Sequence, residues 1–92
     1  MIDRLTVERI KEAANIVEVV GDYVSLKRAG ANYKGLCPFH NEKTPSFIVS
    51  PARGTCHCFG CGKGGNAISF LMEMEQITYP EALRRLAAKY HI

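Results

Sequence analysis

Apolar residues in the N-terminal part of the chain recur every three or four positions, as they do along one face of a helix. The positions that follow this spacing are Ile10, Ala13, Ala14 and Val17. Asn15, with Glu18 three residues later, is typical of a capping box and marks the start of a second short helix. Because glycine is favoured where a helix stops, we expect Gly21 to end it.

The same spacing returns in the C-terminal part and predicts two more helices. Asn66 can cap a helix that runs to about Glu75. Thr78, Pro80 and Glu81 together indicate the start of the last helix. The apolar faces of these two helices are Ala67, Phe70, Leu71 and Met74, and then Leu83, Leu86, Ala87 and Tyr90. We expect these faces to cover a core.

Between the helical parts the apolar period changes to two, which is the period of a strand. Val24 and Leu26 fall on one face of a first strand, and Tyr23, Ser25 and Lys27 fall on the other. After Gly30 the segment 32–36 can return antiparallel. The segments 46–50 and 55–58 form a second pair across the turn at 51–54.

The composition is that of one small globular domain. The chain has 92 residues, of which 47% are hydrophobic and 23% charged, and at this size a metal or a cross-link commonly supplements the core. No apolar run approaches the roughly 18–20 residues of a membrane span, and Met1–Arg4 lacks the pattern of a signal peptide. We therefore expect a cytoplasmic protein without a membrane partner. In that reducing compartment, four cysteines indicate a metal site rather than disulfides.

The cysteines and one histidine have the spacing of a two-knuckle zinc site. Cys37 and His40 are three residues apart, Cys58 and Cys61 are also three apart, and 17 residues separate the two pairs. Since four protein ligands fill a tetrahedral shell, we expect one structural zinc ion with no open position for catalysis. The sequence thus predicts an α+β zinc ribbon, a small antiparallel sheet with short helices at both ends. The domain covers residues 1–92, with helical parts at 1–22 and 66–92 and the ribbon at 23–65.

Two neighbouring residues could compete for the metal, but their positions argue against it. Cys56 is too far from Cys61 for a knuckle, and strand alternation places His57 on the face opposite Cys58. Cys56 shares the face of Cys58, where we expect it to pack as a small apolar side chain. A redox switch that pairs Cys56 with Cys58 or Cys61 and ejects zinc is an alternative.

Charge is unevenly distributed, because the middle of the chain is basic. Between residues 23 and 66 there are six basic residues and a single acidic one, Glu42. An excess of this kind favours a polyanionic partner. The candidates for contacts with phosphates are Lys27, Arg28, Lys34, Lys43, Arg53 and Lys63. The aromatic candidates for stacking on bases are Tyr33, Phe39, Phe47 and Phe59.

Three motifs together closely resemble the zinc-binding domain of bacterial DNA primase. They are Tyr33-Lys34-Gly35-Leu36-Cys37-Pro38-Phe39-His40-Asn41-Glu42-Lys43-Thr44-Pro45-Ser46-Phe47, His57-Cys58-Phe59-Gly60-Cys61-Gly62 and Gly64-Gly65-Asn66-Ala67. The resemblance extends over nearly the whole chain, and the family's zinc ligands fall on Cys37, His40, Cys58 and Cys61. Where the family often has an aromatic residue before the His-Cys of the second knuckle, this sequence has Cys56.

The resemblance implies a module that binds single-stranded template DNA and helps select the start site of RNA primers during replication. In the family a magnesium-dependent catalytic domain follows, which the zinc domain assists in cis or in trans, and then a region that binds the replicative helicase. Neither lies in these residues, so we expect a monomeric fragment that is not catalytic by itself. The alternative is a zinc-stabilised protein interaction module with a merely solvated basic face, which salt-sensitive DNA binding would distinguish.

Overall fold

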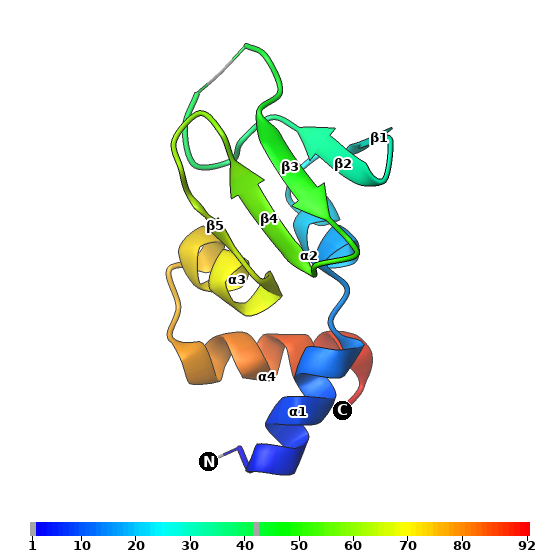
Figure 1. Ribbon diagram of the computed structural model, residues 1–92. Coiled ribbons are helices and arrows are strands. Elements are labelled where there is room, and N and C mark those ends of the chain that lie inside the picture. The colour runs from blue at the N-terminus through cyan, green and yellow to red at the C-terminus, as the bar shows by residue number, and fades with distance from the viewer. Residues whose placement is uncertain (1, 42) are drawn as a thin grey trace.

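The chain folds as an antiparallel sheet with helices stacked beneath it (Figure 1). The computed structural model describes residues 2–41 and 43–92. Within them the helices are α1 (Arg4–Ala13), α2 (Ile16–Gly21), α3 (Ala67–Glu75) and α4 (Tyr79–Tyr90). The strands are β1 (Lys27–Ala29), β2 (Asn32–Gly35), β3 (Phe47–Ser50), β4 (Thr55–Cys58) and β5 (Gly64–Gly65). In this part of the chain no helix has the length and apolar character needed to cross a membrane.

The strands follow one another across the sheet in sequence order, and every neighbouring pair is antiparallel. Side chains alternate between the two faces. Phe47 and Val49 of β3, with Cys56 and Cys58 of β4, are buried on the face that meets α2 and α3. The opposite surface, which we call the outer face, carries residues that are half-buried or exposed, among them Ile48, Ser50, Thr55 and His57.

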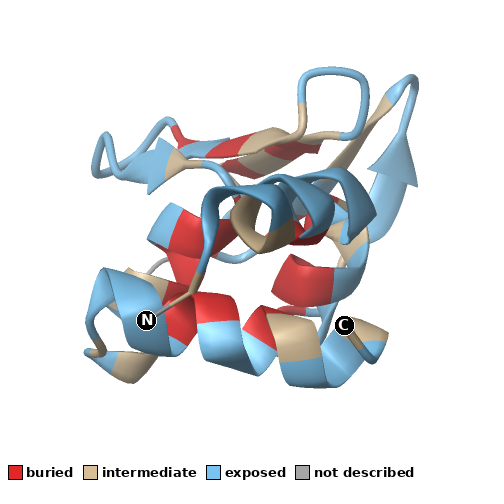
Figure 2. Ribbon diagram, turned by 90° about the horizontal axis from the view of Figure 1, so that it is seen from below, coloured by how far each residue is buried: buried red, intermediate tan, exposed pale blue. Residues whose placement is uncertain are grey.

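The core lies where the sheet meets the helices (Figure 2). Phe47 is completely buried and its ring lies 6.1 Å from that of Phe70 in α3. Phe39 contacts both rings at 6.2 and 5.8 Å between centroids, edge-on to each. Edge-on contacts of this kind suit the quadrupole of aromatic rings. The aromatic cluster therefore joins the sheet to α3, while α1 and α4 pack together below.

The predicted α+β fold, with a small antiparallel sheet between terminal helices, is confirmed. The predicted first strand at 23–27 is wrong in position, because β1 begins only at Lys27. The amides of Tyr23 and Val24 still donate to the carbonyl of Val20, so the chain continues to turn after α2. The alternation that indicated a strand arises because the Val24 side chain is buried while Tyr23 packs edge-on against Phe70.

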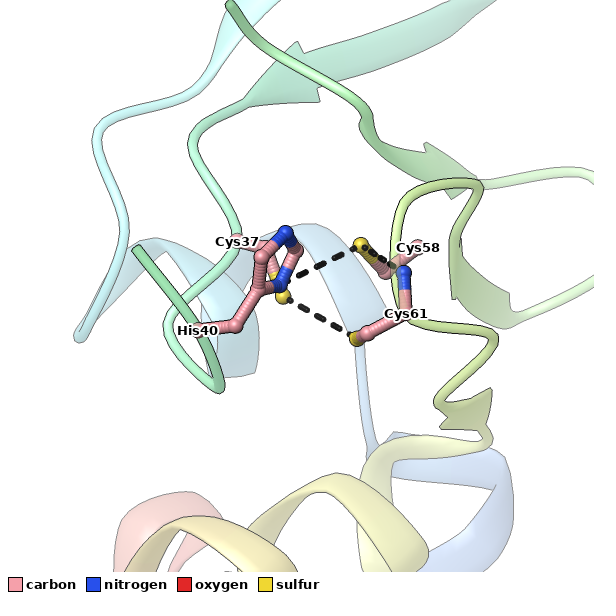
Figure 3. Close-up of side chains that lie close together, drawn as sticks. All are labelled: Cys37, His40, Cys58 and Cys61. Atoms are coloured by element: carbon pink, nitrogen blue, oxygen red, sulfur yellow. Dashed lines mark hydrogen bonds between the residues drawn. The ribbon is translucent and has the colours of Figure 1, made fainter. Parts of the chain in front are cut away.

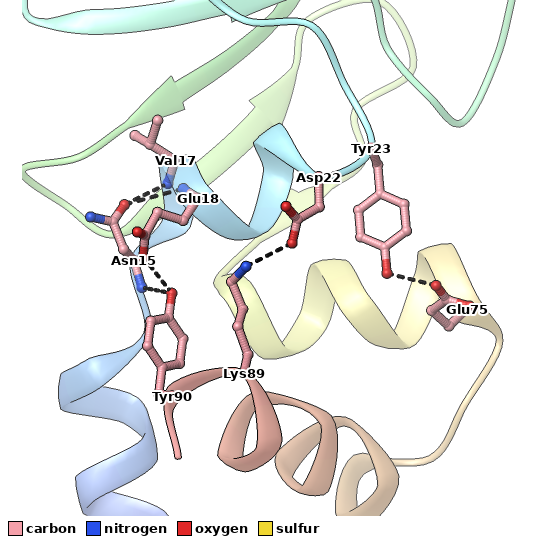
Figure 4. A network of polar contacts seen from close by, with 8 residues as sticks. All are labelled: Asn15, Val17, Glu18, Asp22, Tyr23, Glu75, Lys89 and Tyr90. Atoms are coloured by element: carbon pink, nitrogen blue, oxygen red, sulfur yellow. Dashed lines mark hydrogen bonds and ion pairs between the residues drawn. The ribbon is translucent and has the colours of Figure 1, made fainter. Parts of the chain in front are cut away.

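The capping box predicted at the start of α2 forms only in half. The Asn15 side chain accepts hydrogen bonds from the amides of Val17 and Glu18, as expected. In a complete capping box the Glu18 carboxylate would accept a hydrogen bond from the Asn15 amide. Here the hydroxyl of a residue in α4 accepts that bond instead (Figure 4). The Asn15 amide donates to Tyr90 Oη at 3.0 Å, and that hydroxyl donates to Glu18 Oε1 at 2.8 Å. Tyr90 therefore ties the end of α4 to the junction of α1 and α2.

Replacing Tyr90 by phenylalanine should lower the free energy of unfolding by about 1–2 kcal/mol, since it removes one hydrogen-bond acceptor and one donor at a helix cap. Tyr79→Phe is the matched control, because the Tyr79 hydroxyl makes no hydrogen bond within the described residues. Denaturant unfolding of the two zinc-loaded variants measures the difference. Equal stability of both would show that the Tyr90 hydroxyl contributes nothing.

Candidate metal centre

Two tight turns at one end of the sheet carry the four predicted ligands. The first turn follows β2, and within it the amide of Phe39 donates to Cys37 Sγ at 3.4 Å. The second begins at Cys58, the last residue of β4, where the amide of Cys61 donates to Cys58 Sγ at 3.4 Å. Each turn thus presents a sulfur that already accepts a backbone hydrogen bond. This is the support that metal-bound sulfur receives from its surroundings in zinc sites.

Glycine is favoured in the second turn for two different reasons. Gly62 has a φ of +82°, a conformation that costs a residue with a Cβ, and its amide donates to the carbonyl of Cys58 at 2.8 Å. Gly60 lies under the imidazole of His40, where an added Cβ would come within 3.0 Å of Nε2. These residues let the second turn close against the first.

The four ligand atoms lie within 4.8 Å of one another. Figure 3 shows the side chains of Cys37 and His40 facing those of Cys58 and Cys61. The Sγ atoms of Cys37 and Cys61 are 3.7 Å apart, and Cys58 Sγ lies 3.9 Å from His40 Nδ1. Ideal zinc–ligand bonds in a tetrahedron separate two sulfurs by about 3.8 Å, and a sulfur and a nitrogen by about 3.6 Å. The arrangement therefore fits a tetrahedral zinc ion.

The pKa values of the Cys37 and Cys58 thiols are shifted in opposite directions. Burial raises the pKa of Cys37 to about 12. Burial also acts to raise the pKa of Cys58, but the hydrogen bond from the Cys61 amide and the Ser46 hydroxyl, 3.6 Å from the sulfur, outweigh it and lower that pKa to about 6. A zinc ion requires both residues as thiolates, and its charge would offset the cost of placing them together.

Cys56 and His57 lie outside the ligand cluster, as predicted. Cys56 is buried, and its thiol donates to the carbonyl of Gly65 at 3.5 Å. His57 lies on the outer face, with its ring 4.7 Å from that of Phe59. In the described part of the chain, the predicted ligands are the one group of three or more Cys, His, Asp or Glu side chains that can converge on an ion.

The structure separates the predicted DNA contacts into two groups. Lys27 and Lys34 are paired across β1 and β2, Arg53 lies in the turn between β3 and β4, and the Phe59 ring is 72% exposed. Lys43 is exposed in the loop that follows the first turn. These five remain candidates for the interface.

The other candidates are engaged within the fold. Lys63 pairs with Glu73 at 3.2 Å and lies over the Phe39 ring, while Arg28 Nε donates to the nearby carbonyl of Gly30. Tyr33 packs against the core from the inner side of the sheet. Phe47 is completely buried and offers no ring face to a base, so we withdraw it as a stacking residue. Its burial follows from the inward orientation that it shares with Val49.

Sequence reasoning missed one feature of the outer face. A hollow of about 380 Å³ lies over β3 and β4, and His57 and Ile48 are among its lining residues. The signal was present in the strand alternation, since residues 48, 50, 55 and 57 share one face of the predicted pair. To place these four residues side by side one must know the register of the two strands, which cannot be read from the sequence.

Comparison with known proteins identifies this arrangement. Residues 2–92 match the CHC2 zinc finger family. The chain belongs to this family. It is 62% identical over 84 residues to a DNA primase of Geobacillus stearothermophilus, covering 91% of this chain and 14% of that protein. It is 54% identical over 89 residues to a DNA primase of Thermotoga maritima, covering 97% of this chain and 16% of that protein.

A solved structure shares the fold of this CHC2 zinc finger. It is that of the Aquifex aeolicus primase, described as its zinc-binding and RNA polymerase domains. The TM-score is 0.89 at 43% identity, and the match covers 94% of this chain and 21% of that one. The chain is therefore a zinc-binding domain of the kind found in bacterial DNA primases. It spans about a seventh of the length of the curated relatives named above.

Zinc removal should unfold this CHC2 zinc finger, because structural zinc contributes on the order of 10 kcal/mol and is coupled to folding. We expect one zinc ion per chain by elemental analysis. After chelation, we expect loss of cooperative thermal unfolding by circular dichroism. A metal-free chain with native circular dichroism and an unchanged melting temperature would refute this prediction.

A pair of serine variants tests the choice of ligands. Cys58→Ser should lose zinc, while Cys56→Ser should keep it, because only the Cys58 sulfur belongs to the ligand cluster. The two residues are matched in burial and in strand. Zinc content after gel filtration measures the outcome, and equal loss in both variants would contradict the assignment.

Proposed function

We propose that this domain binds single-stranded template DNA on its outer face and helps select the start site for RNA primer synthesis. One structural zinc ion, held by Cys37, His40, Cys58 and Cys61, cross-links the two turns and leaves no coordination site open for substrate. The observation that carries the proposal is the paired cationic side chains of Lys27 and Lys34 on the outer face, opposite the face that meets α2 and α3.

The paired lysines favour an anionic partner on energetic grounds. Like charges directly opposite each other in a sheet destabilise it. Neither Lys27 nor Lys34 makes an ion pair with a described residue. A phosphate between them would relieve the repulsion and release counterions, which is the main source of affinity for nucleic acid. Arg53 extends the same cationic surface to the turn between β3 and β4.

The remaining steps of priming are assigned to parts of the enzyme outside these residues. A magnesium-dependent catalytic domain would join nucleotides, with this domain assisting it from the same or a neighbouring molecule. A further region would bind the replicative helicase. The names of the relatives, all DNA primases, and the polymerase domain in the Aquifex structure support this division.

A second candidate is a protein interaction module, and one observation favours it. Phe59 and Leu36 are large apolar side chains that are 72% and 49% exposed near the ribbon's metal end. Exposed apolar residues can mark a protein interface. Salt dependence distinguishes the two functions, since an apolar interface does not weaken with salt as a phosphate contact does.

Binding of the zinc-loaded chain to single-stranded oligonucleotides should weaken steeply with salt. The double variant Lys27→Glu/Lys34→Glu should reduce the slope of log affinity against log salt by about 0.7 for each phosphate that is no longer neutralised. Arg9→Glu/Arg84→Glu is the matched control, because both residues are exposed on the helical side and form no ion pair with a described residue. Fluorescence anisotropy over a salt series measures the slopes.

The two double variants make the same change of charge, so a general electrostatic effect would alter both equally. Equal slopes for both, with zinc content intact, would place the nucleic-acid interface elsewhere. Salt-independent binding by the unmodified chain would instead favour the protein interaction module.

A further inference from the structure

We propose that the hollow on the outer face seats one unstacked base of the bound strand and reads its edge through Asn32 and Thr55. The proposal rests on the proposed function and adds to it the residues that determine sequence preference. The hollow has a volume of about 380 Å³. That lies in the range of small-ligand sites, about 300–1,000 Å³.

One side of the hollow suits the flat face of a base. The rings of His57 and Phe59 meet edge-on with their centroids 4.7 Å apart, and both line the hollow. Ile48 lies directly across the strand pair from His57 and adds an apolar floor. Bases stack on aromatic and apolar side chains because every base has a π-face, whatever its identity. This side therefore provides affinity without choosing among bases.

The other side of the hollow is polar. Asn32, Ser50 and Thr55 line it, and all three are half-buried. Ser50 and Thr55 are directly paired across β3 and β4. Among the described residues none of the three side chains has a hydrogen-bond partner, although half-buried polar groups gain stability from one.

These groups have the donors and acceptors that distinguish bases. The carboxamide of Asn32 can donate and accept at the same time, as in the bidentate pairing of asparagine with adenine, and the hydroxyl of Thr55 can do either. A base edge is accessible to them only when the base is neither paired nor stacked on its neighbours. The hollow therefore fits a single strand and not a duplex.

Cationic side chains flank the hollow where the strand backbone would pass. Arg53 lines it from the turn between β3 and β4. Lys34 does not line the hollow itself but lies in β2 directly across from Ile48, which does. A base on the His57–Phe59 pair would thus have two cations nearby that can contact its flanking phosphates. This charge favours a nucleotide over the apolar side chain of another protein.

The experiment measures the affinity of the zinc-loaded chain for five hexanucleotides at low salt. Four differ only in the base at one central position, and the fifth is abasic there. The unmodified chain should bind its preferred base at least about fivefold more tightly than the abasic strand. Phe59→Ala should reduce binding of all four bases to the abasic level and leave the abasic strand unaffected.

The double variant Asn32→Ala/Thr55→Val should abolish the ranking among the four bases while it retains their advantage over the abasic strand. Asn41→Ala/Thr6→Val is the matched control, because both residues lie outside the hollow, and it should keep the ranking. The side-chain amide resonances of Asn32 should also shift on titration with the preferred strand but not with the abasic one.

The outcomes separate this inference from the proposed function. Equal binding of all five strands, or a ranking that survives Asn32→Ala/Thr55→Val, would overturn the base-reading hollow while DNA binding itself stands. No binding of any strand at low salt would overturn the proposed function and the inference together.

Discussion

The convergence of two turns on one zinc-binding cluster, made by Cys37, His40, Cys58 and Cys61, is the constraint on which the rest of this domain depends. The turns leave the sheet at β2 and β4, and their sulfurs approach to 3.7 Å, a separation that two thiolates tolerate only when a cation lies between them. The aromatic cluster of Phe39, Phe47 and Phe70 lies beside this centre and joins it to α3. The metal site, the sheet and α3 are therefore packed into one continuous unit.

The metal also determines the composition of the outer face. Cys58 must point inward to reach the ion, and side chains alternate along β4. This requirement sends His57 and Thr55 outward and Cys56 inward, while pairing with β3 places Ile48 and Ser50 beside the outward pair. A one-residue change of register would exchange every side chain between the faces. The ligand spacing thus specifies which residues are available to a partner.

The sequence predicts well the features that depend on neighbours along the chain. Ligand spacing identified the cluster, and the caps Asn15, Asn66 and Thr78 identified three helix starts, because each acts over a few residues. Features that depend on distant residues were missed. Val24 is buried because it packs into the core, although it does not lie in a strand, and Tyr90 completes a cap 75 residues away. The strand β5 was missed for another reason, because its two residues are too few to show alternation.

Charge is divided between the two sides of the domain by number as well as by pairing, because the excess of basic residues lies in the ribbon. On the helical side, Asp22 pairs with Lys89 and Glu75 with Arg85, while Arg9 and Arg84 form no ion pair with a described residue. Lys27 and Lys34 have no such partner in the described chain. Surface ion pairs contribute little stability. The basic excess of the ribbon, with Lys27 and Lys34 unpaired among the described residues, is therefore the source of a positive field on the outer face.

Phe59 belongs to a metal-binding turn and also lines the hollow of the positively charged outer face. Phe59 lies between Cys58 and Cys61 in the second turn, and its amide donates to the carbonyl of Ser46 at 3.0 Å. The residue is 72% exposed, its ring packs edge-on against that of His57, and the turn that zinc would close fixes the position of its backbone. A preorganised aromatic surface loses less entropy when a ligand stacks on it. The ion that we expect to stabilise the fold would therefore also prepare the surface at which we propose that a base binds.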